Sequence, residues 1–187
     1  MANEPGSTIL STHGGYRTLK SYQGAEIIHD ATVAFCRRFM SDFDRTKSQM
    51  VQAARSGKQN IVEGTMASGT SKEMELKLLG VARASLKELL TDYEDYLRQH
   101  ELQIWDRSDA KTARIREMVY VVDRTYETYE KLVTEEPAET AANTVICLIH
   151  QTTYLLRKQL MALEEEFLRD GDLRERMSAG RRQRRRR

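Results

Sequence analysis

The sequence predicts an all-α protein, an antiparallel up-and-down four-helix bundle with an extended C-terminal helical segment. Three observations favour this fold class. Apolar residues recur every three or four positions over long stretches, which places them on one face of a helix. The 187 residues contain two prolines, Pro5 and Pro137, and both lie outside these stretches. The alternation of apolar and polar residues that is typical of a half-buried strand is absent.

The first two helices are expected over residues 21–43 and 46–67, where apolar positions repeat with the helical period. Thr46 and Gln49 fit a capping box at the start of the second helix, in which each side chain hydrogen-bonds the backbone N–H of the other residue. The face of the first helix that we expect to be buried carries Ala25, Ile28, Thr32, Phe35 and Phe39.

The second helix has an inner face of unusually small residues. A glycine in a helix interior costs about 1 kcal/mol relative to alanine, so a glycine on the buried face needs a reason. Gly57 and Gly64, together with Ala53, therefore predict that another backbone approaches this helix closely. The complete inner face comprises Met50, Ala53, Gly57, Ile61 and Gly64.

A third helix is expected over residues 71–100, which would be about 45 Å long. Thr70 and Glu73 fit a second capping box at its start. Residues 101–107 are expected to form a loop with one apolar anchor, Trp105. The buried face of this third helix is expected to carry Leu79, Ala82, Leu86, Leu89, Tyr93 and Leu97.

Two further helices complete the pattern. The fourth is expected over residues 108–134, with Ser108 as its N-cap. Pro137 suits the first turn of the fifth helix, where its missing N–H is not needed, and the pattern continues to about Arg169. These two helices either form one bundle helix with an appended arm or bend back on each other.

The chain accordingly divides into four parts, and we expect it to lie in the cytoplasm. Residues 1–20 are a flexible lead-in, 21–134 the bundle, 135–170 a long helix that packs on or completes the bundle, and 171–187 a disordered arginine-rich tail. The sequence shows neither the apolar run of a membrane-spanning helix nor a recognisable signal peptide. Two cysteines do not make a disulfide framework, which favours a reducing compartment.

The net charge of +2 combines an acidic body with a cationic tail. Six of the 30 basic residues lie in the last seven positions, which leaves 24 basic and 28 acidic residues elsewhere, a charge of −4. Such a tail can bind phosphate backbones by counterion release, or it can act only as a solubilising terminus. The arginines are Arg181, Arg182, Arg184, Arg185, Arg186 and Arg187.

A second set of basic residues surrounds the first predicted turn. The second helix contains one acidic residue, Glu63, against three basic ones. This excess indicates a patch that contacts phosphate groups, although ordinary solvated charge would give the same pattern. The residues of this patch are Arg37, Arg38, Arg45, Lys47, Arg55 and Lys58.

No catalytic or metal motif is complete. A carboxylate-bridged di-iron centre needs two Glu-x-x-His pairs, and Glu26 with His29 supplies one. Cys147 and His150 lie one turn apart, and with His29 and Cys36 they form the best alternative metal set, although zinc usually takes three or four ligands from one site. The sequence has no phosphate loop and no G-x-S-x-G. We therefore expect no enzymatic activity, no metal and no cofactor.

The segment 48–97 resembles a known family. Residues 52–64 read QAARSGKQNIVEG, residues 71–73 read SKE and residues 84–89 read ASLKEL. These are similar to the signature of the four-helix-bundle proteins first known from intervening sequences in bacterial ribosomal RNA genes. The resemblance covers about residues 16–123, and the extension from residue 124 looks like the subgroup with a four-helix-bundle suffix region.

The resemblance implies partners as well as a fold. The family includes the accessory variability proteins of diversity-generating retroelements, which are homopentameric barrels that bind nucleic acid and a reverse transcriptase. It therefore implies a bacterial protein that assembles with itself as a pentamer and binds RNA, DNA or another protein such as a reverse transcriptase.

Three hypotheses follow from the residues and the resemblance. The leading one is a non-enzymatic, self-associating adaptor that binds nucleic acid through its basic residues. The second is a purely protein-binding scaffold in which the fifth helix is the docking element. The third, a metal-dependent enzyme, requires a bound metal.

Overall fold

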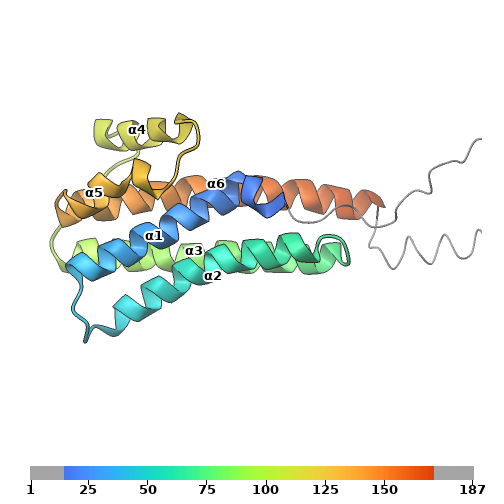
Figure 1. The fold of residues 1–187 in the computed structure, drawn as a ribbon, viewed down its shortest axis with the longest axis horizontal. Coiled ribbons are helices and arrows are strands. Elements are labelled where there is room, and N and C mark those ends of the chain that lie inside the picture. Colours follow the sequence, from blue (N-terminus) through green and yellow to red (C-terminus); the bar gives the residue numbers. More distant parts are fainter. Residues whose placement is uncertain (1–14, 171–187) are drawn as a thin grey trace, which may run out of the picture.

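The computed structural model describes residues 15–170, and every regular element in this range is helical, which confirms the predicted all-α class (Figure 1). Most of the predicted lead-in and the whole arginine-rich tail lie outside the described residues. The elements are η1 (Gly15–Thr18), α1 (Lys20–Phe39), α2 (Arg45–Ala67), α3 (Lys72–Gln99), α4 (Ala110–Glu117), η2 (Met118–Tyr120), η3 (Tyr126–Thr128), α5 (Glu130–Thr134) and α6 (Ala138–Asp170).

Four long helices form the body of the protein. Both α1 and α3 contact α2 and α6, so each long helix has two long neighbours. The colours in Figure 1 show that α1, α2, α3 and α6 run alternately in opposite directions along the long axis. The short helices lie outside this body, where α5 contacts α1 and α6, and α4 contacts α6. No helix among residues 15–170 has the length and apolar character needed to span a membrane.

The core lies between the four long helices and uses the predicted apolar faces. Phe35, Leu86 and Tyr93 are fully buried. The Tyr93 hydroxyl donates a hydrogen bond to Thr32 Oγ1 at 3.2 Å, so this buried phenol keeps a polar partner. Phe35 meets Tyr93 and Tyr96 edge-on, with ring centroids 5.0 and 4.9 Å apart. The long, evenly spaced apolar faces thus account for the burial of α1 and α3.

Glycines allow the long helices to approach one another. A Cβ atom added to Gly57 would lie 2.8 Å from Leu86 Cγ and Cδ2 in α3, and one added to Gly64 would lie 3.4 Å from three atoms of α3. Gly24 in α1, which the sequence did not single out, has the same relation to α6, because an added Cβ would overlap Thr152 Oγ1. The α1–α6 contact therefore also depends on a small residue.

The first predicted helix boundary and capping box are wrong. α1 ends at Phe39 rather than at Phe43, whose side chain is 97% exposed. The N-cap of α2 is Asp44, and its carboxylate accepts a hydrogen bond from the backbone N–H of Thr46 at 2.9 Å. No capping box forms between Thr46 and Gln49, because Asp44 already satisfies a free N–H of the first turn.

The other two predicted N-caps differ from the observed ones by one residue each. Thr70 and Glu73 do not form the expected capping box, because the hydroxyl of Ser71 caps α3 instead. Asp109, and not Ser108, caps α4. In each case the residue that takes the N-cap position has an extended backbone and a side-chain oxygen within reach of the first turn.

The predicted continuous helix over residues 108–134 is wrong. The chain leaves helical geometry after Tyr120, passes through Asp123 with a φ of 53°, and resumes in η3 and α5. Val122, an apolar residue within this range, is 84% exposed. α4 and α5, which lie before and after this break, each contact α6, so the chain turns between them. The fourth long helix of the body is therefore α6. The predicted fifth helix is confirmed as α6, which begins directly after Pro137.

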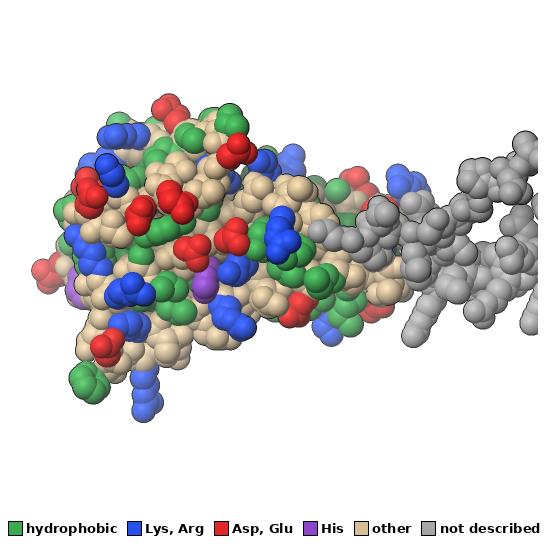
Figure 2. Space-filling model, in the orientation of Figure 1, with side chains coloured by type: hydrophobic (Ala, Val, Ile, Leu, Met, Phe, Trp, Pro, Cys, Tyr) green, Lys and Arg blue, Asp and Glu red, His purple; other side chains and the backbone are tan. Residues whose placement is uncertain are grey.

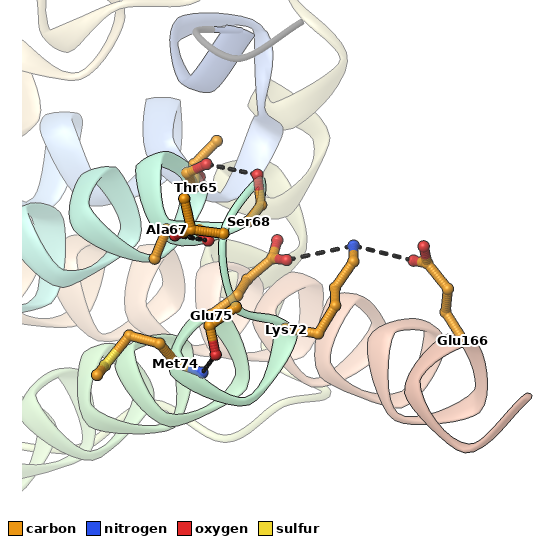
Figure 3. A network of polar contacts seen from close by, with 9 residues as sticks. Thr65, Ala67, Ser68, Lys72, Met74, Glu75 and Glu166 are labelled. Carbon is orange, nitrogen blue, oxygen red and sulfur yellow. Dashed lines mark hydrogen bonds and ion pairs between the residues drawn. The ribbon is translucent and has the colours of Figure 1, made fainter. Parts of the chain in front are cut away.

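An ion-pair network ties the start of α3 to the far half of α6 (Figure 3). Lys72 Nζ lies 3.4 Å from Glu75 Oε2 and 3.2 Å from Glu166 Oε2. The Glu75 side chain is 7% exposed, so its carboxylate lies out of water beside a cation. Burying a carboxylate is tolerated because the neighbouring ammonium compensates its charge.

Candidate nucleic-acid interface

Arg38, one of the basic residues predicted to contact phosphate, is already engaged within the protein. Its guanidinium donates hydrogen bonds to the backbone carbonyl oxygens of Val133, Glu135 and Glu136 at 3.1, 3.2 and 2.5 Å. These carbonyls lie at the end of α5, where a helix leaves carbonyl oxygens without helical partners. The guanidinium also lies 4.4 Å from the ring centroid of Phe39. Arg38 therefore joins α1 to the end of α5.

The other predicted basic residues differ in their exposure to solvent and in whether they pair with acidic side chains. Lys47 forms an ion pair with Asp42, at 2.5 Å between Nζ and Oδ1. On the face in Figure 2, basic and acidic side chains are interspersed. The exposed residues are Arg37, Arg45 and Arg55, and Lys58 is half-buried. The predicted tail contacts, Arg181, Arg182, Arg184, Arg185, Arg186 and Arg187, lie outside the described residues.

The predicted metal-ligand candidates do not converge. Among residues 15–170, no three His, Cys, Asp or Glu side chains group so that they could hold a metal ion. His29 Nδ1 lies 3.2 Å from Asp30 Oδ1. Burial raises the pKa of the Cys36 thiol to about 12 and that of the Cys147 thiol to about 11. Both thiols are therefore protonated at neutral pH and are poor nucleophiles.

A groove of about 710 Å³ lies between α4 and α6, and the loop before α4 forms part of its wall. Its volume falls within the range of about 300–1,000 Å³ that is usual for small-molecule sites. The residues that line it are Ile104, Trp105, Arg107, Thr112, Arg116, Asn143, Ile146, Cys147, His150, Gln151 and Tyr154.

Hydrogen bonds fix the loop before α4 on the surface of α6. The backbone N–H of Trp105 donates to Asn143 Oδ1 at 2.8 Å, and its indole Nε1–H donates to Glu139 Oε1 at 2.9 Å. Asn143 Nδ2 in turn donates to the carbonyl oxygens of Gln103 and Glu139, each at 2.8 Å. The sequence predicted Trp105 as the anchor of this loop, and its hydrogen bonds show how the anchor is held.

Cationic side chains lie beside the aromatic rings of the groove, and the indole N–H of Trp105 is held by the Glu139 carboxylate. Arg107 and Arg116 are exposed at its rim, and no carboxylate occurs among the described residues that line it. Lys111 Nζ lies 4.9 Å from the Trp105 ring centroid. The Tyr154 ring lies within 6 Å of two cations, with Arg157 Cζ at 5.7 Å and Lys158 Nζ at 5.9 Å from its centroid. Cationic side chains and accessible aromatic faces therefore occur together along α4 and α6.

The floor of the groove is polar but poorly paired. Thr112, which is 6% exposed, and Gln151 each place a buried side-chain oxygen here without a hydrogen-bond partner of ordinary geometry among residues 15–170. The Thr112 hydroxyl also faces the Cys147 thiol, and this contact lowers the pKa of the thiol by less than burial raises it. Because such oxygens normally find a partner, the floor is suited to a ligand or water that donates hydrogen bonds.

Sequence reasoning missed most of this site. Cys147 and His150 were noticed only as metal ligands, and Arg107 and Arg116 were not singled out. Their proximity depends on α4 turning back along α6, which a continuous helix over residues 108–134 would not allow. The available signal was the density of basic residues around the one tryptophan, from Arg107 to Arg116.

The chain was compared with protein-family models, curated proteins and solved structures, and none of them matches it.

Proposed function

We propose that this protein is a non-enzymatic helical protein that binds nucleic acid, and that the groove between α4 and α6 is its main contact. The observation that carries this proposal is the combination of cationic side chains with aromatic rings around a groove that no carboxylate among its described residues lines. Cations neutralise phosphates, and exposed rings stack on bases.

The groove supports this function better than the basic patch predicted around the first turn. Arg38 and Lys47 of that patch already bind protein groups, whereas Arg107 and Arg116 are exposed at the rim of a groove. The raised pKa of Cys147, about 11, argues against a nucleophilic role for the thiol in the groove. The site is therefore suited to binding rather than to covalent catalysis.

Charge reversal tests the proposal. Binding of a fluorescent RNA should be measured by anisotropy between about 50 and 200 mM salt for the protein and for variants. Arg107→Glu combined with Arg116→Glu should weaken binding at least about tenfold and flatten its salt dependence, because two phosphate contacts are lost. Arg45→Glu combined with Arg55→Glu, both at exposed positions of α2, serves as a charge-matched control and should bind nearly as well as the wild type.

Two results would contradict the proposal. One is the absence of any RNA or DNA binding at about 50 mM salt, where electrostatic contacts are strong. The other is an equal loss in the charge-matched α2 control and in the groove variant, which would place the contact outside the groove. Retention of a protein partner by a protein that binds no nucleic acid would favour the scaffold alternative.

Self-association belongs to the same proposal and is supported by the family resemblance. A pentamer should show a light-scattering mass about five times that of the 21.6 kDa chain. A monomeric mass at the concentrations used for binding would contradict it.

A further inference from the structure

The α4–α6 groove contains uncharged polar groups as well as the arginines. The inference from these groups rests on the proposed function. Gln151 Oε1 and Thr112 Oγ1 are buried oxygens of residues that line the groove. Gln151 Oε1 has no hydrogen-bond partner among the described residues, and Thr112 Oγ1 faces only the Cys147 thiol, a weak partner. They come from opposite walls, Gln151 from α6 and Thr112 from α4. A buried polar atom that lacks a full partner is destabilising, so a groove whose lining residues carry two such oxygens is suited to a ligand that supplies donors.

Rings lie close to these oxygens. Tyr154 follows Gln151 by three residues on α6, so both side chains lie on the same face of the helix, and the Tyr154 side chain is 51% exposed. Trp105 lines the same groove from the loop before α4. The arrangement combines flat apolar faces, buried hydrogen-bonding groups and rim arginines, which match the ring, the edge and the phosphate of a nucleotide.

We propose that the groove receives an unpaired nucleobase, whose Watson–Crick edge binds Gln151 and Thr112 while its phosphate lies at Arg107 and Arg116. Side-chain amides pair with base edges through two hydrogen bonds, and a hydroxyl can donate or accept. In a duplex, this edge is already hydrogen-bonded to the opposite strand, so the groove selects single strands, loops or free nucleotides.

The one tryptophan of the chain, Trp105, makes this site directly observable. Titration with a short single-stranded RNA, with its duplex and with a nucleoside monophosphate should be followed by intrinsic fluorescence. The single strand should quench Trp105 and bind at least about tenfold more tightly than the duplex. Quenching by the monophosphate at similar concentrations supports the base pocket and assigns it to free nucleotides, whereas tighter binding of the strand assigns it to single-stranded nucleic acid.

Variants of the floor separate base recognition from charge. Gln151→Ala and the near-isosteric Thr112→Val should each lose most of the preference for the single strand while duplex binding and its salt dependence stay unchanged. Gln59→Ala, at an exposed position of α2, is the matched control and should behave like the wild type. Far-ultraviolet circular dichroism identifies any variant that fails to fold, and the other floor variant then provides the test.

The outcomes distinguish this inference from the proposed function. If the arginine variants weaken binding but strand preference is absent or insensitive to both floor variants, water satisfies the floor and the inference is wrong. If an extended acidic peptide quenches Trp105 and the RNA does not, both are wrong and the groove is a protein-binding site. If the arginine variants bind RNA like the wild type, the proposed function is wrong, and the inference that rests on it is wrong as well.

Discussion

Glycines in this protein occupy opposite environments, and the difference decides what a methyl group would do there. Gly57 lies on the buried face of α2 against Leu86, whereas Gly80 lies on the exposed face of α3 with open space around it. Helix propensity alone favours alanine over glycine at both positions. Packing opposes that preference at Gly57, because the buried Leu86 side chain would have to move.

We therefore expect Gly57→Ala and Gly80→Ala to shift stability in opposite directions. Gly80→Ala should raise the free energy of unfolding by about 0.5–1 kcal/mol, and Gly57→Ala should lower it by about 1–2 kcal/mol. Urea unfolding followed by circular dichroism measures both. Equal effects of the two substitutions would mean that α2 and α3 are farther apart than described.

Buried acidic groups make stability depend on alkaline pH. Burial raises the pKa of Cys36 to about 12 from its ordinary value of 9.0. Between these values the folded protein keeps a proton that the unfolded chain loses, so the free energy of unfolding falls as pH rises, by up to about 1.4 kcal/mol per pH unit. Below about pH 9 this contribution does not change with pH.

The variant Cys36→Ala should flatten the alkaline slope. The free energy of unfolding, measured with urea between about pH 9 and 11, should fall less steeply with pH than in the wild type. The difference should reach up to about 1.4 kcal/mol per pH unit, the equivalent of one proton, whatever the stability at pH 7. Cys147→Ala provides the comparison, since the pKa of its thiol rises only to about 11 and its contribution should end at lower pH. An unchanged slope in Cys36→Ala would show that its thiol is exposed.

At the scale of elements, the long helices could be predicted from sequence and the segment between α3 and α6 could not. Apolar residues at helical spacing reflect burial along one face, and this is enough to place α1, α2, α3 and α6. The break near Asp123 depends on tertiary contacts instead. Arg124 is buried and reaches the Tyr129 hydroxyl at 3.4 Å, while the neighbouring Val122 points into solvent. No local pattern indicates which apolar residue of such a run is left exposed.

The same reason limits prediction of the candidate site. Its residues lie on a loop, on α4 and on α6, and their helical spacing within each element says nothing about how the elements face one another. Arg38 shows the converse, because a charge that looked free in the sequence caps α5 in the structure.

Arg38 should therefore contribute to stability more than its neighbour does. Arg38→Met removes hydrogen bonds to three carbonyl oxygens and should cost about 1–2 kcal/mol, less than a buried network would because the side chain is partly in solvent. Arg37→Met, at an exposed position of the same helix, should change stability by less than about 0.5 kcal/mol. Thermal or urea unfolding compares them, and similar values for both would show that the α1–α5 junction does not depend on Arg38.

At the scale of the whole molecule, the body and the proposed binding groove are built from partly separate elements. The body is formed by α1, α2, α3 and α6. α4 contributes a wall of the groove and contacts the body through α6, with Thr112 and Ile115 as its buried residues. Changes in α4 can therefore alter binding while the four long helices keep their contacts.

The exposed chain between η2 and η3 has one more consequence. Val122 lies in this stretch and is 84% exposed, so a recognition sequence for a site-specific protease inserted after Val122 should be cut in the folded protein. The two pieces should stay together after cleavage, because α6 in the second piece packs against α1 and α3 in the first. A nicked sample should elute at the intact size on gel filtration and separate into two bands only under denaturing conditions. Such a protein could also be reassembled from two separately expressed halves, and halves that failed to associate would show that α6 holds the body together only when covalently joined to it.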